Sequence, residues 1–277
     1  MVKVKLILSL CFVILFFSCK KDEVIWQVQN LNLNNKTFAF GHGGMGIMYR
    51  FPMNSIQSLT EVLKKGADGT EMDLQLTKDN QLVLFHSIRL EDASNGNGLV
   101  RNKNWEDIKN VDYTYPLFTK TKLISIEDFF NQIKVDGHIF TFDCKVESKE
   151  DPDYLQNFAS TLYNFIKKYE LENNCFIESY NLTFLQALSA QNKNLKLFIH
   201  SDTYAAGLVV SKEVNLYGMT LDRLKITKEE IAEAHQQGLH ITLYNMVNAS
   251  ENLKAIQMNA DFLQTDKIEQ LIEIVSK

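Results

Sequence analysis

Two carboxylates, Glu71 and Asp73, stand two residues apart, and on an extended strand this spacing places both side chains on the same side. Carboxylates so close repel each other unless a cation lies between them. Because oxygen ligands suit hard divalent ions, the pair favours Mg²⁺ or Ca²⁺. Either acid taken alone is equally well explained as a solvated surface residue, so the metal hypothesis depends on further residues converging on the same place.

A histidine comes near this pair if the chain folds back. The segment that ends at His86 follows the strand of Glu71 after only four linking residues, 77–80. That link is too short for a parallel crossover and therefore predicts a hairpin. With Asp79 and Asn80 as the two turn residues, the register sets Asp73 opposite His86 and Glu71 opposite Ile88.

Short β-branched or aromatic runs alternate with segments of helical period along most of the chain, which is typical of parallel strands joined by crossover helices. Eight such units predict an α/β fold, a closed (β/α)8 TIM barrel with an extra hairpin strand after strand 2, and such barrels carry their working residues at the carboxyl ends of the strands. An open doubly wound sheet is the alternative, although no Gly-x-Gly-x-x-Gly turn suggests dinucleotide binding. We expect strands near 38–42, 68–74, 138–145, 174–180, 195–200, 214–219, 239–244 and 260–265.

Start signals mark several of the helices between these strands. Asn54, followed by Gln57 three residues later, predicts a helix start, and Thr227 with Glu230 forms a capping-box pair. Pro152 occupies a first helical position. These signals place helices where the barrel needs crossovers.

The composition is that of an ordinary globular protein. The chain has 277 residues, of which 45% are hydrophobic and 23% charged, and its formal net charge is -5. This length can form one large core without a second domain. Since the lysines are scattered among acids, nothing predicts a nucleic-acid partner.

The first residues form a separate region. Lys3 and Lys5 precede an apolar run, 6–17, that stops just before Cys19, the layout of a secretory signal. The ending resembles a bacterial lipobox, so we predict a lipoprotein signal peptide over 1–19 with lipidation at Cys19. An ordinary secreted protein with a chance cysteine is the alternative, and a spanning anchor is disfavoured because the run is short.

The predicted lipoprotein signal determines where we expect the protein to be located. We expect residues 20–35 to form a flexible tether, because they are polar and rich in asparagine, and residues 36–277 to form the domain. The protein would then be an exported bacterial lipoprotein, held to a membrane by its lipid and located in the periplasm or at the outer membrane or cell surface.

Cys144 and Cys175 are the cysteines of the domain. They could pair in an exported protein. Both fall on strands predicted to be neighbours, where sulfurs seldom meet with disulfide geometry, so we expect two buried free thiols.

The stretch from Gly66 to His86 resembles the signature of glycerophosphodiester phosphodiesterases, which belong to the phospholipase-C-like barrel superfamily. Residues 95–98, 124–129 and 262–266 resemble later landmarks of that family. The similarity covers nearly the whole chain after the signal segment. It implies a TIM barrel that hydrolyses a glycerophosphodiester or related phosphodiester to an alcohol and a phosphomonoester.

The resemblance also implies roles for individual residues. His42 and His86 become the acid and base pair, Glu71 and Asp73 become ligands of a divalent metal ion, Mg²⁺ or Ca²⁺, and Asp143 stands where the family has a third, glutamate ligand. Two further positions match substrate-binding positions. They are Lys145, which could pair with phosphate or form a salt bridge, and Tyr244, which could pack on the alcohol or in the core.

The chain departs from the family pattern beside the first histidine. Gly43 replaces an arginine that resembles a phosphate clamp, Met53 replaces an acid, and Ser87 replaces an aspartate. Substrate phosphate could instead be bound by backbone amides around Gly43, or by Arg50 or Arg89. The alternative is a catalytically weak barrel that serves as a ligand-binding cell-envelope lipoprotein.

Overall fold

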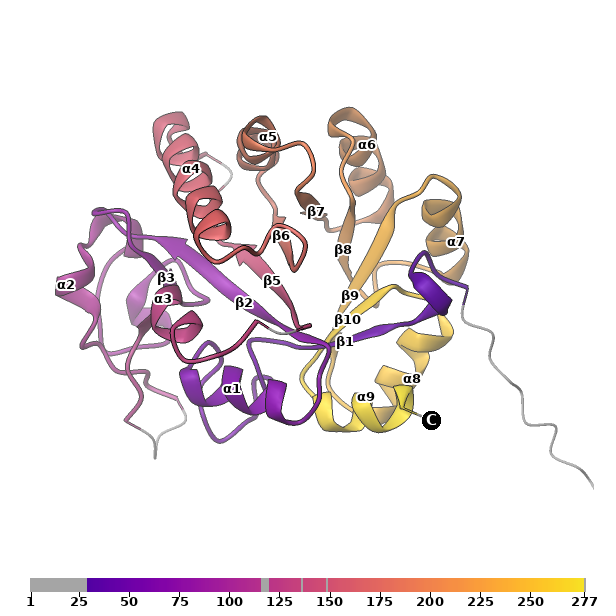
Figure 1. Ribbon diagram of the computed structural model, residues 1–277, viewed down its shortest axis with the longest axis horizontal. Helices are drawn as coiled ribbons and strands as arrows, with labels where there is room; N and C mark the ends of the chain where they lie inside the picture. The colour runs from indigo at the N-terminus through magenta and orange to yellow at the C-terminus, as the bar shows by residue number, and fades with distance from the viewer. Residues whose placement is uncertain (1–28, 116–119, 136, 148, 277) are drawn as a thin grey trace, which may run out of the picture.

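Eight parallel strands form a closed barrel in the computed structural model, which describes residues 29–115, 120–135, 137–147 and 149–276 (Figure 1). Each strand pairs with its neighbour, and closure is completed by β1, which pairs with both β10 and β2. The predicted TIM barrel is therefore confirmed. Its strands are β1 (Phe38–Gly41), β2 (Gly69–Leu76), β5 (Ile139–Cys144), β6 (Cys175–Ser179), β7 (Lys196–His200), β8 (Gly218–Asp222), β9 (His240–Met246) and β10 (Phe262–Thr265).

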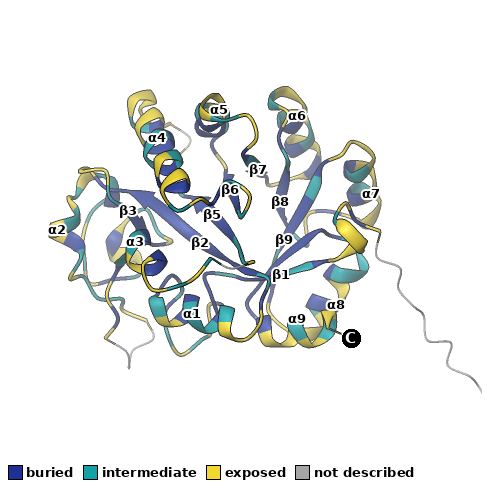
Figure 2. Ribbon diagram, viewed as in Figure 1, coloured by how far each residue is buried: buried dark blue, intermediate teal, exposed yellow. Residues whose placement is uncertain are grey.

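Helices surround this barrel and bury one face each against it. Figure 2 shows strands that are almost entirely buried and helices whose outer faces are exposed, as expected for amphipathic crossovers. The longest, α4 (Pro152–Lys168), begins with Pro152 at its first position and Asp151 as its cap, as predicted. The other helices are α1 (Ile56–Lys64), α2 (Trp105–Ile108), α3 (Ile126–Phe130), α5 (Leu182–Gln191), α6 (Tyr204–Val214), α7 (Lys228–Gln236), α8 (Ala249–Gln257) and α9 (Ile268–Val275).

Two boundaries differ from the sequence prediction. Residues 214–217 were expected to begin a strand, but α6 continues to Val214 and ends with Asn215 in the left-handed conformation, so that β8 begins only at Gly218. Helix α1 is capped by Ser55, whose hydroxyl accepts a hydrogen bond from the amide of Ser58. Asn54, the predicted cap, has a positive φ of 63°. Its side chain donates a hydrogen bond to Asp73 on β2 instead of capping the helix.

The predicted capping box of α7 is confirmed. The Thr227 hydroxyl accepts from the Glu230 amide, and the Glu230 carboxylate accepts from the Thr227 amide. Both contacts satisfy amides that have no partner within the helix.

Between β2 and β5 the chain makes a hairpin and a longer excursion, which lies along one side of the barrel in Figure 1. Strand β3 (Leu82–Leu84) pairs antiparallel with β2, and β4 (Ile124–Ser125) pairs with β3. The predicted hairpin is confirmed, but its predicted register is wrong by one residue. Asp73 pairs with Phe85 rather than with His86.

The register differs because the turn has three residues rather than two. Thr77 and Gln81 close the loop through the Thr77 amide and the Gln81 carbonyl, and Asn80 adopts a left-handed conformation with φ 64°. A turn followed by a left-handed residue is the usual three-residue hairpin loop. It shifts each pairing by one position.

The barrel interior is layered. Aromatic rings fill its amino-terminal end, with Phe176 packed 4.7 Å from Phe262 and 5.3 Å from Phe198, and Phe40 stacked 5.7 Å from Phe262 (ring centroids). Further along the same strands the inward side chains become polar. The hydrophobic floor thus supports a polar layer at the carboxyl ends of the strands, where a TIM barrel carries its site.

The chain enters the domain earlier than expected. We placed residues up to 35 in the tether, but the Asn30 side-chain amide donates to the Ala260 carbonyl and the Leu31 amide donates to Asp261. These contacts fix residues 30 and 31 on the barrel. The predicted signal peptide and Cys19 lie outside the described residues, and no helix in the described ranges is long and apolar enough to cross a membrane.

Cys144 and Cys175 are both buried and both free, as predicted. Burial raises the pKa of the Cys175 thiol to about 12. These two thiols are therefore part of the packed core.

Candidate active site

Three acids meet where β2 and β5 lie side by side. Parallel pairing sets Asp73 beside Asp143, and Glu71 lies on the same face two residues earlier. One carboxylate oxygen from each lies within 4.8 Å of the other two, and all three residues are buried. The Glu71 Oε1 atom has no hydrogen-bond partner among the described residues. A buried group of three carboxylates, with one oxygen left without a partner in the described chain, fits a hard divalent cation.

Lys145 lies between two of these acids. Its ammonium nitrogen is 2.8 Å from Asp73 Oδ1 and 2.6 Å from Asp143 Oδ2. The salt-bridge alternative is therefore realised for Asp143. Although burial opposes its charge, the three surrounding carboxylates raise the pKa of Lys145 well above its ordinary value, so it stays charged.

The acids are held in unequal electrostatic environments. Burial and the charges of Asp73 and Asp143 raise the pKa of Glu71 well above its usual range. Burial alone would raise the pKa of Asp73 too, but the charges of Lys145 and His86 outweigh it and hold that pKa below its ordinary value. Asp73 is thus a permanent anion, whereas Glu71 needs additional positive charge to ionise.

His42 follows β1 and reaches the same rim. Its Nδ1 atom lies 2.9 Å from Asp266 Oδ1, and that carboxylate also accepts from the Ile47 amide. A carboxylate at Nδ1 fixes the orientation of the ring and leaves Nε2 for other partners.

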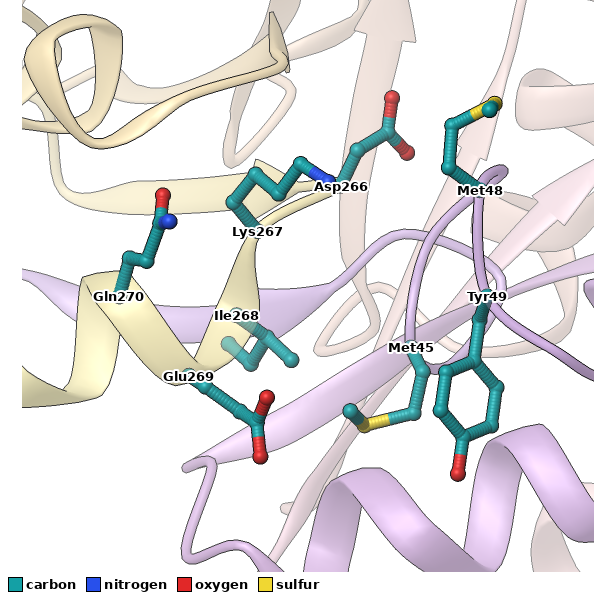
Figure 3. A pocket seen from close by; sticks show the side chains of 8 residues that line it. All are labelled: Met45, Met48, Tyr49, Asp266, Lys267, Ile268, Glu269 and Gln270. Atoms are coloured by element: carbon teal, nitrogen blue, oxygen red, sulfur yellow. The ribbon is translucent and has the colours of Figure 1, made fainter.

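Asp266 also borders a cavity of about 210 Å³, between the loop after β1 and the start of α9. Figure 3 shows Asp266 between Lys267 and the loop that carries Met48. The acid that orients His42 is therefore itself held between two elements.

His86 lies just beyond β3 and lines a cavity of about 240 Å³ that His42 also lines. The two predicted catalytic histidines thus share one opening. Most of its remaining wall is apolar or aromatic, formed by Ile47, Pro52, Met53, Phe85, Ala93, Tyr113 and Tyr115.

Asn54 contacts one of the three acids, Asp73, directly, which the sequence did not indicate. Its side-chain amide donates to Asp73 Oδ2 at 2.6 Å, and its Oδ1 accepts from the Asp73 backbone amide at 2.9 Å. Asn54 is almost fully buried. Two hydrogen bonds to one residue fix both the backbone and the carboxylate of Asp73.

Gly43 has φ +56°, and its amide donates to Glu71 Oε2 at 2.7 Å. This amide therefore orients a predicted metal ligand. The two candidate arginines have other contacts. The guanidinium of Arg50 lies over the Phe51 ring, and Arg89 pairs with Glu91.

A second group of polar side chains adjoins the first through Asp143. Glu178 on β6 pairs in register with Asp143, and His200 ends β7, the next strand. The His200 Nε2 atom is 3.7 Å from Asp143 Oδ2 and 3.7 Å from Glu178 Oε2. Burial lowers the pKa of His200 to about 4, and burial with the charge of Asp143 raises that of Glu178 to about 8.

Aromatic rings surround this second group. The His200 ring stacks on Tyr180 at 4.5 Å and lies 5.2 Å from the ring of Tyr244 (centroids). Tyr244, predicted to bind substrate, is thus half-buried at the rim beside His200.

Residues 45–270 match the glycerophosphoryl diester phosphodiesterase family. The chain belongs to this family. Membership in this family makes it a phosphoric diester hydrolase, as the resemblance of residues 66–86 to the family signature implied. It is 26% identical over 246 residues to the glycerophosphodiester phosphodiesterase of Caldanaerobacter subterraneus subsp. tengcongensis, covering 87% of this chain and 99% of that one. A Bacillus altitudinis enzyme of the same name is 23% identical over 248 residues, covering 86% and 98%.

Solved structures show the same fold. A glycerophosphodiester phosphodiesterase from Parabacteroides distasonis superposes with a TM-score of 0.75 at 19% identity, covering 87% of this chain and 97% of that one. A phosphodiesterase from Oleispira antarctica, solved with the product sn-glycerol-3-phosphate, gives 0.76 at 15% identity and covers 86% and 96%. At these identities the likeness establishes the barrel alone.

Sequence reasoning missed the roles of Asn54, Glu178 and His200. Asn54 resembled a helix cap, and its left-handed backbone conformation was not foreseen. For Glu178 and His200 a signal existed, because each is a polar residue at the carboxyl end of an otherwise apolar strand.

Proposed function

We propose that this protein hydrolyses a glycerophosphodiester, or a closely related phosphodiester, with a divalent ion, Mg²⁺ or Ca²⁺, held by Glu71, Asp73 and Asp143. The observation that carries the proposal is the group of three buried carboxylates, with one orphaned oxygen, beside the opening shared by His42 and His86. When bound, the metal neutralises phosphate charge and polarises the phosphorus centre.

The histidines supply the proton transfers. Asp266 accepts the Nδ1 hydrogen of His42, so His42 Nε2 exchanges the proton with substrate. One histidine takes a proton from the attacking hydroxyl, and the other, across the opening, protonates the leaving alcohol. Lys145, charged and buried between two acids, faces the phosphate side.

The remaining wall residues position the substrate. The apolar side of the cavity, including Met53 and Tyr113, receives the alcohol portion. Tyr244 lies outside the wall of this cavity, with its ring 5.2 Å from that of His200 (centroids), and would contact substrate only from that side. Gly43 contributes indirectly, since its amide holds Glu71. This role needs no arginine at position 43.

The test uses the full chain, purified in detergent, with glycerophosphocholine and bis-p-nitrophenyl phosphate as substrates. We expect turnover with Mg²⁺ or Ca²⁺ that a chelator abolishes and either ion restores. Family membership favours this outcome over the binding-protein alternative. Absence of metal-dependent turnover of both substrates at high enzyme concentration would refute the proposal and favour the binding protein.

Replacing His42 by alanine removes one proton-transfer group. We expect His42→Ala to lower kcat by about 10²–10⁴-fold with unchanged folding, which is the usual contribution of a positioned acid or base. His138→Gln is the matched control, because His138 lies before β5 at the opposite end of that strand from Asp143. Normal turnover by His42→Ala would exclude the assigned role.

We also propose that Cys19 is lipidated and anchors an exported protein in the periplasm or at the outer membrane or cell surface. The support is the apolar run that ends at Cys19. In a bacterial host, labelled fatty acid should enter the wild type and not Cys19→Ala, which should leave the membrane fraction. Equal labelling of both proteins would contradict the proposal.

A further inference from the structure

Asp143, Glu178 and His200 form a compact group of potential metal ligands, of which the proposed reaction uses only Asp143. They come from three successive strands, β5, β6 and β7, and point inward at the same rim. One ligand atom of each lies within 4.8 Å of the other two. The His200 Nε2 atom is equidistant, at 3.7 Å, from one oxygen of each acid, beyond hydrogen-bond reach.

Buried polar atoms in this group have no partner. Glu178 is fully buried, and while its Oε1 accepts from Gln264 at 2.7 Å, its Oε2 has no hydrogen-bond partner in the described part of the chain. The Nδ1 atom of His200, which is 8% exposed, is unpartnered as well. An unpaired buried carboxylate oxygen aimed at an imidazole nitrogen and a second acid indicates a missing cation.

The spacing matches a coordinated metal ion. Ligands about 2.0–2.2 Å from a tetrahedral metal are separated from one another by about 3.3–3.6 Å. The two nitrogen–oxygen distances of 3.7 Å are close to that value. Because the set mixes imidazole with carboxylates, it suits Zn²⁺ or a similar transition-metal ion better than Ca²⁺ or Mg²⁺.

Charge balance favours a second ion. The ammonium of Lys145 lies against Asp73 and Asp143, and Glu71 and Glu178 complete a group of four carboxylates. With all four ionised, this one cation leaves three negative charges. One divalent ion leaves one of these charges uncompensated. A second ion makes the site positive by one charge, which a phosphodiester monoanion neutralises.

We infer that Asp143, Glu178 and His200 bind a second divalent ion, of the Zn²⁺ class, in a site that shares Asp143 with the all-oxygen site. The inference deepens the proposed function and rests on it for the first metal. Asp143 can serve both sites because it has two carboxylate oxygens, of which Oδ2, the one facing His200, also lies 2.6 Å from the Lys145 ammonium. Phosphodiester chemistry commonly uses paired metals about 3.5–4 Å apart, which together hold substrate oxygens.

Calorimetric Zn²⁺ titration of the full chain in detergent, with Mg²⁺ saturating, tests the site without substrate. We expect one equivalent of Zn²⁺ to bind the wild type, and His200→Asn and Glu178→Gln each to weaken it at least tenfold, since outer-shell partners alone are worth about 10–100-fold. Glu71→Gln should weaken Mg²⁺ and spare Zn²⁺. His138→Gln should bind both ions normally.

Zn²⁺ affinity that falls with Glu71→Gln and not with His200→Asn would place Zn²⁺ in the all-oxygen site and overturn the inference. No Zn²⁺ binding under saturating Mg²⁺ would overturn it as well. Thermal melts of the metal-free variants identify any loss of fold, and anomalous diffraction at the zinc edge of a soaked wild-type crystal should place the ion about 2.0–2.1 Å from His200 Nε2. An ion found elsewhere would refute the site. Failure of the proposed function would instead appear as absent turnover with both metals bound.

Discussion

Asn54 orients Asp73, one of the three proposed metal ligands, through two hydrogen bonds, one to its side chain and one to its backbone. Its backbone has φ 63°, a conformation that asparagine tolerates better than most residues. Asn54 therefore serves as a positioning residue that links the loop before α1 to β2.

Replacing Asn54 by alanine should separate this role from simple loss of stability. We expect Asn54→Ala to weaken Mg²⁺ or Ca²⁺ binding about 10–100-fold, as for other partners of metal ligands, and to destabilise the fold by about 1–3 kcal/mol. Asn215→Ala is the control, because Asn215 shares the positive φ, 53°, but is exposed at the end of α6. Equal metal affinities in the two variants would show that Asn54 does not orient Asp73.

Gly43 and Met53, two of the positions that the resemblance marks as departures from the family pattern, lie against each other in the structure. A Cβ atom on residue 43 would lie 2.5 Å from Met53 Cε and 2.7 Å from Met53 Cβ. The methionine side chain therefore fills the space next to the glycine. Restoring a side chain at position 43 alone should not restore the family arrangement.

A double-mutant cycle tests this coupling. Gly43→Ala should destabilise the protein by about 1–3 kcal/mol through overpacking. Adding Met53→Ala should recover part of that loss, with a coupling energy of about 0.5–3 kcal/mol in chemical denaturation. Strictly additive effects of the two changes would mean that the clash is relieved by backbone movement instead.

Among the elements, α7 has the clearest local start signal, and its contribution is measurable. Thr227→Ala removes the capping hydroxyl and should cost about 1 kcal/mol, read as a lower urea midpoint at unchanged slope. Thr183→Ala, at an exposed helical position of α5, should change stability by less than half of that. A cost for Thr227→Ala no larger than that of Thr183→Ala would exclude the capping contribution.

Local sequence predicted elements better than it predicted their alignment. The alternation along single strands put Glu71 and Asp73 on one face correctly, because that period belongs to the backbone itself. The β2–β3 register came out one residue wrong, because the left-handed conformation of Asn80 lengthened the turn. The prediction that His86 lies near the acids was therefore reached from a strand pairing that is wrong by one residue.

Contacts between side chains on different strands could not be predicted from the sequence. The groups of Asp143, Glu178 and His200 meet because parallel strands β5, β6 and β7 align in a particular register, which crossover helices set and no local pattern records. Asn54 was misassigned for a related reason. Its partner, Asp73, lies 19 residues away on another element.

For the whole molecule, the aromatic floor joins side chains from strands on different sides of the barrel. Phe176 lies within 6.0 Å (ring centroids) of Phe40, Phe198 and Phe262, which come from three other strands. Phe176→Ala should lower the free energy of unfolding by about 3–5 kcal/mol, and Phe176→Leu by less than half of that. Equal losses for both variants would show that ring volume is not what the floor requires.

The same floor closes the barrel interior at its amino-terminal end. Since packed phenylalanines fill its amino-terminal end, the proposed reaction has to admit substrate and release both products through the rim that carries His42 and Tyr244. Substrate entry and product release would then use the same opening. In the proposed reaction the departing phosphomonoester, which carries more negative charge than the diester it came from, leaves past the same acids and the same Lys145 ammonium that the substrate met on entry.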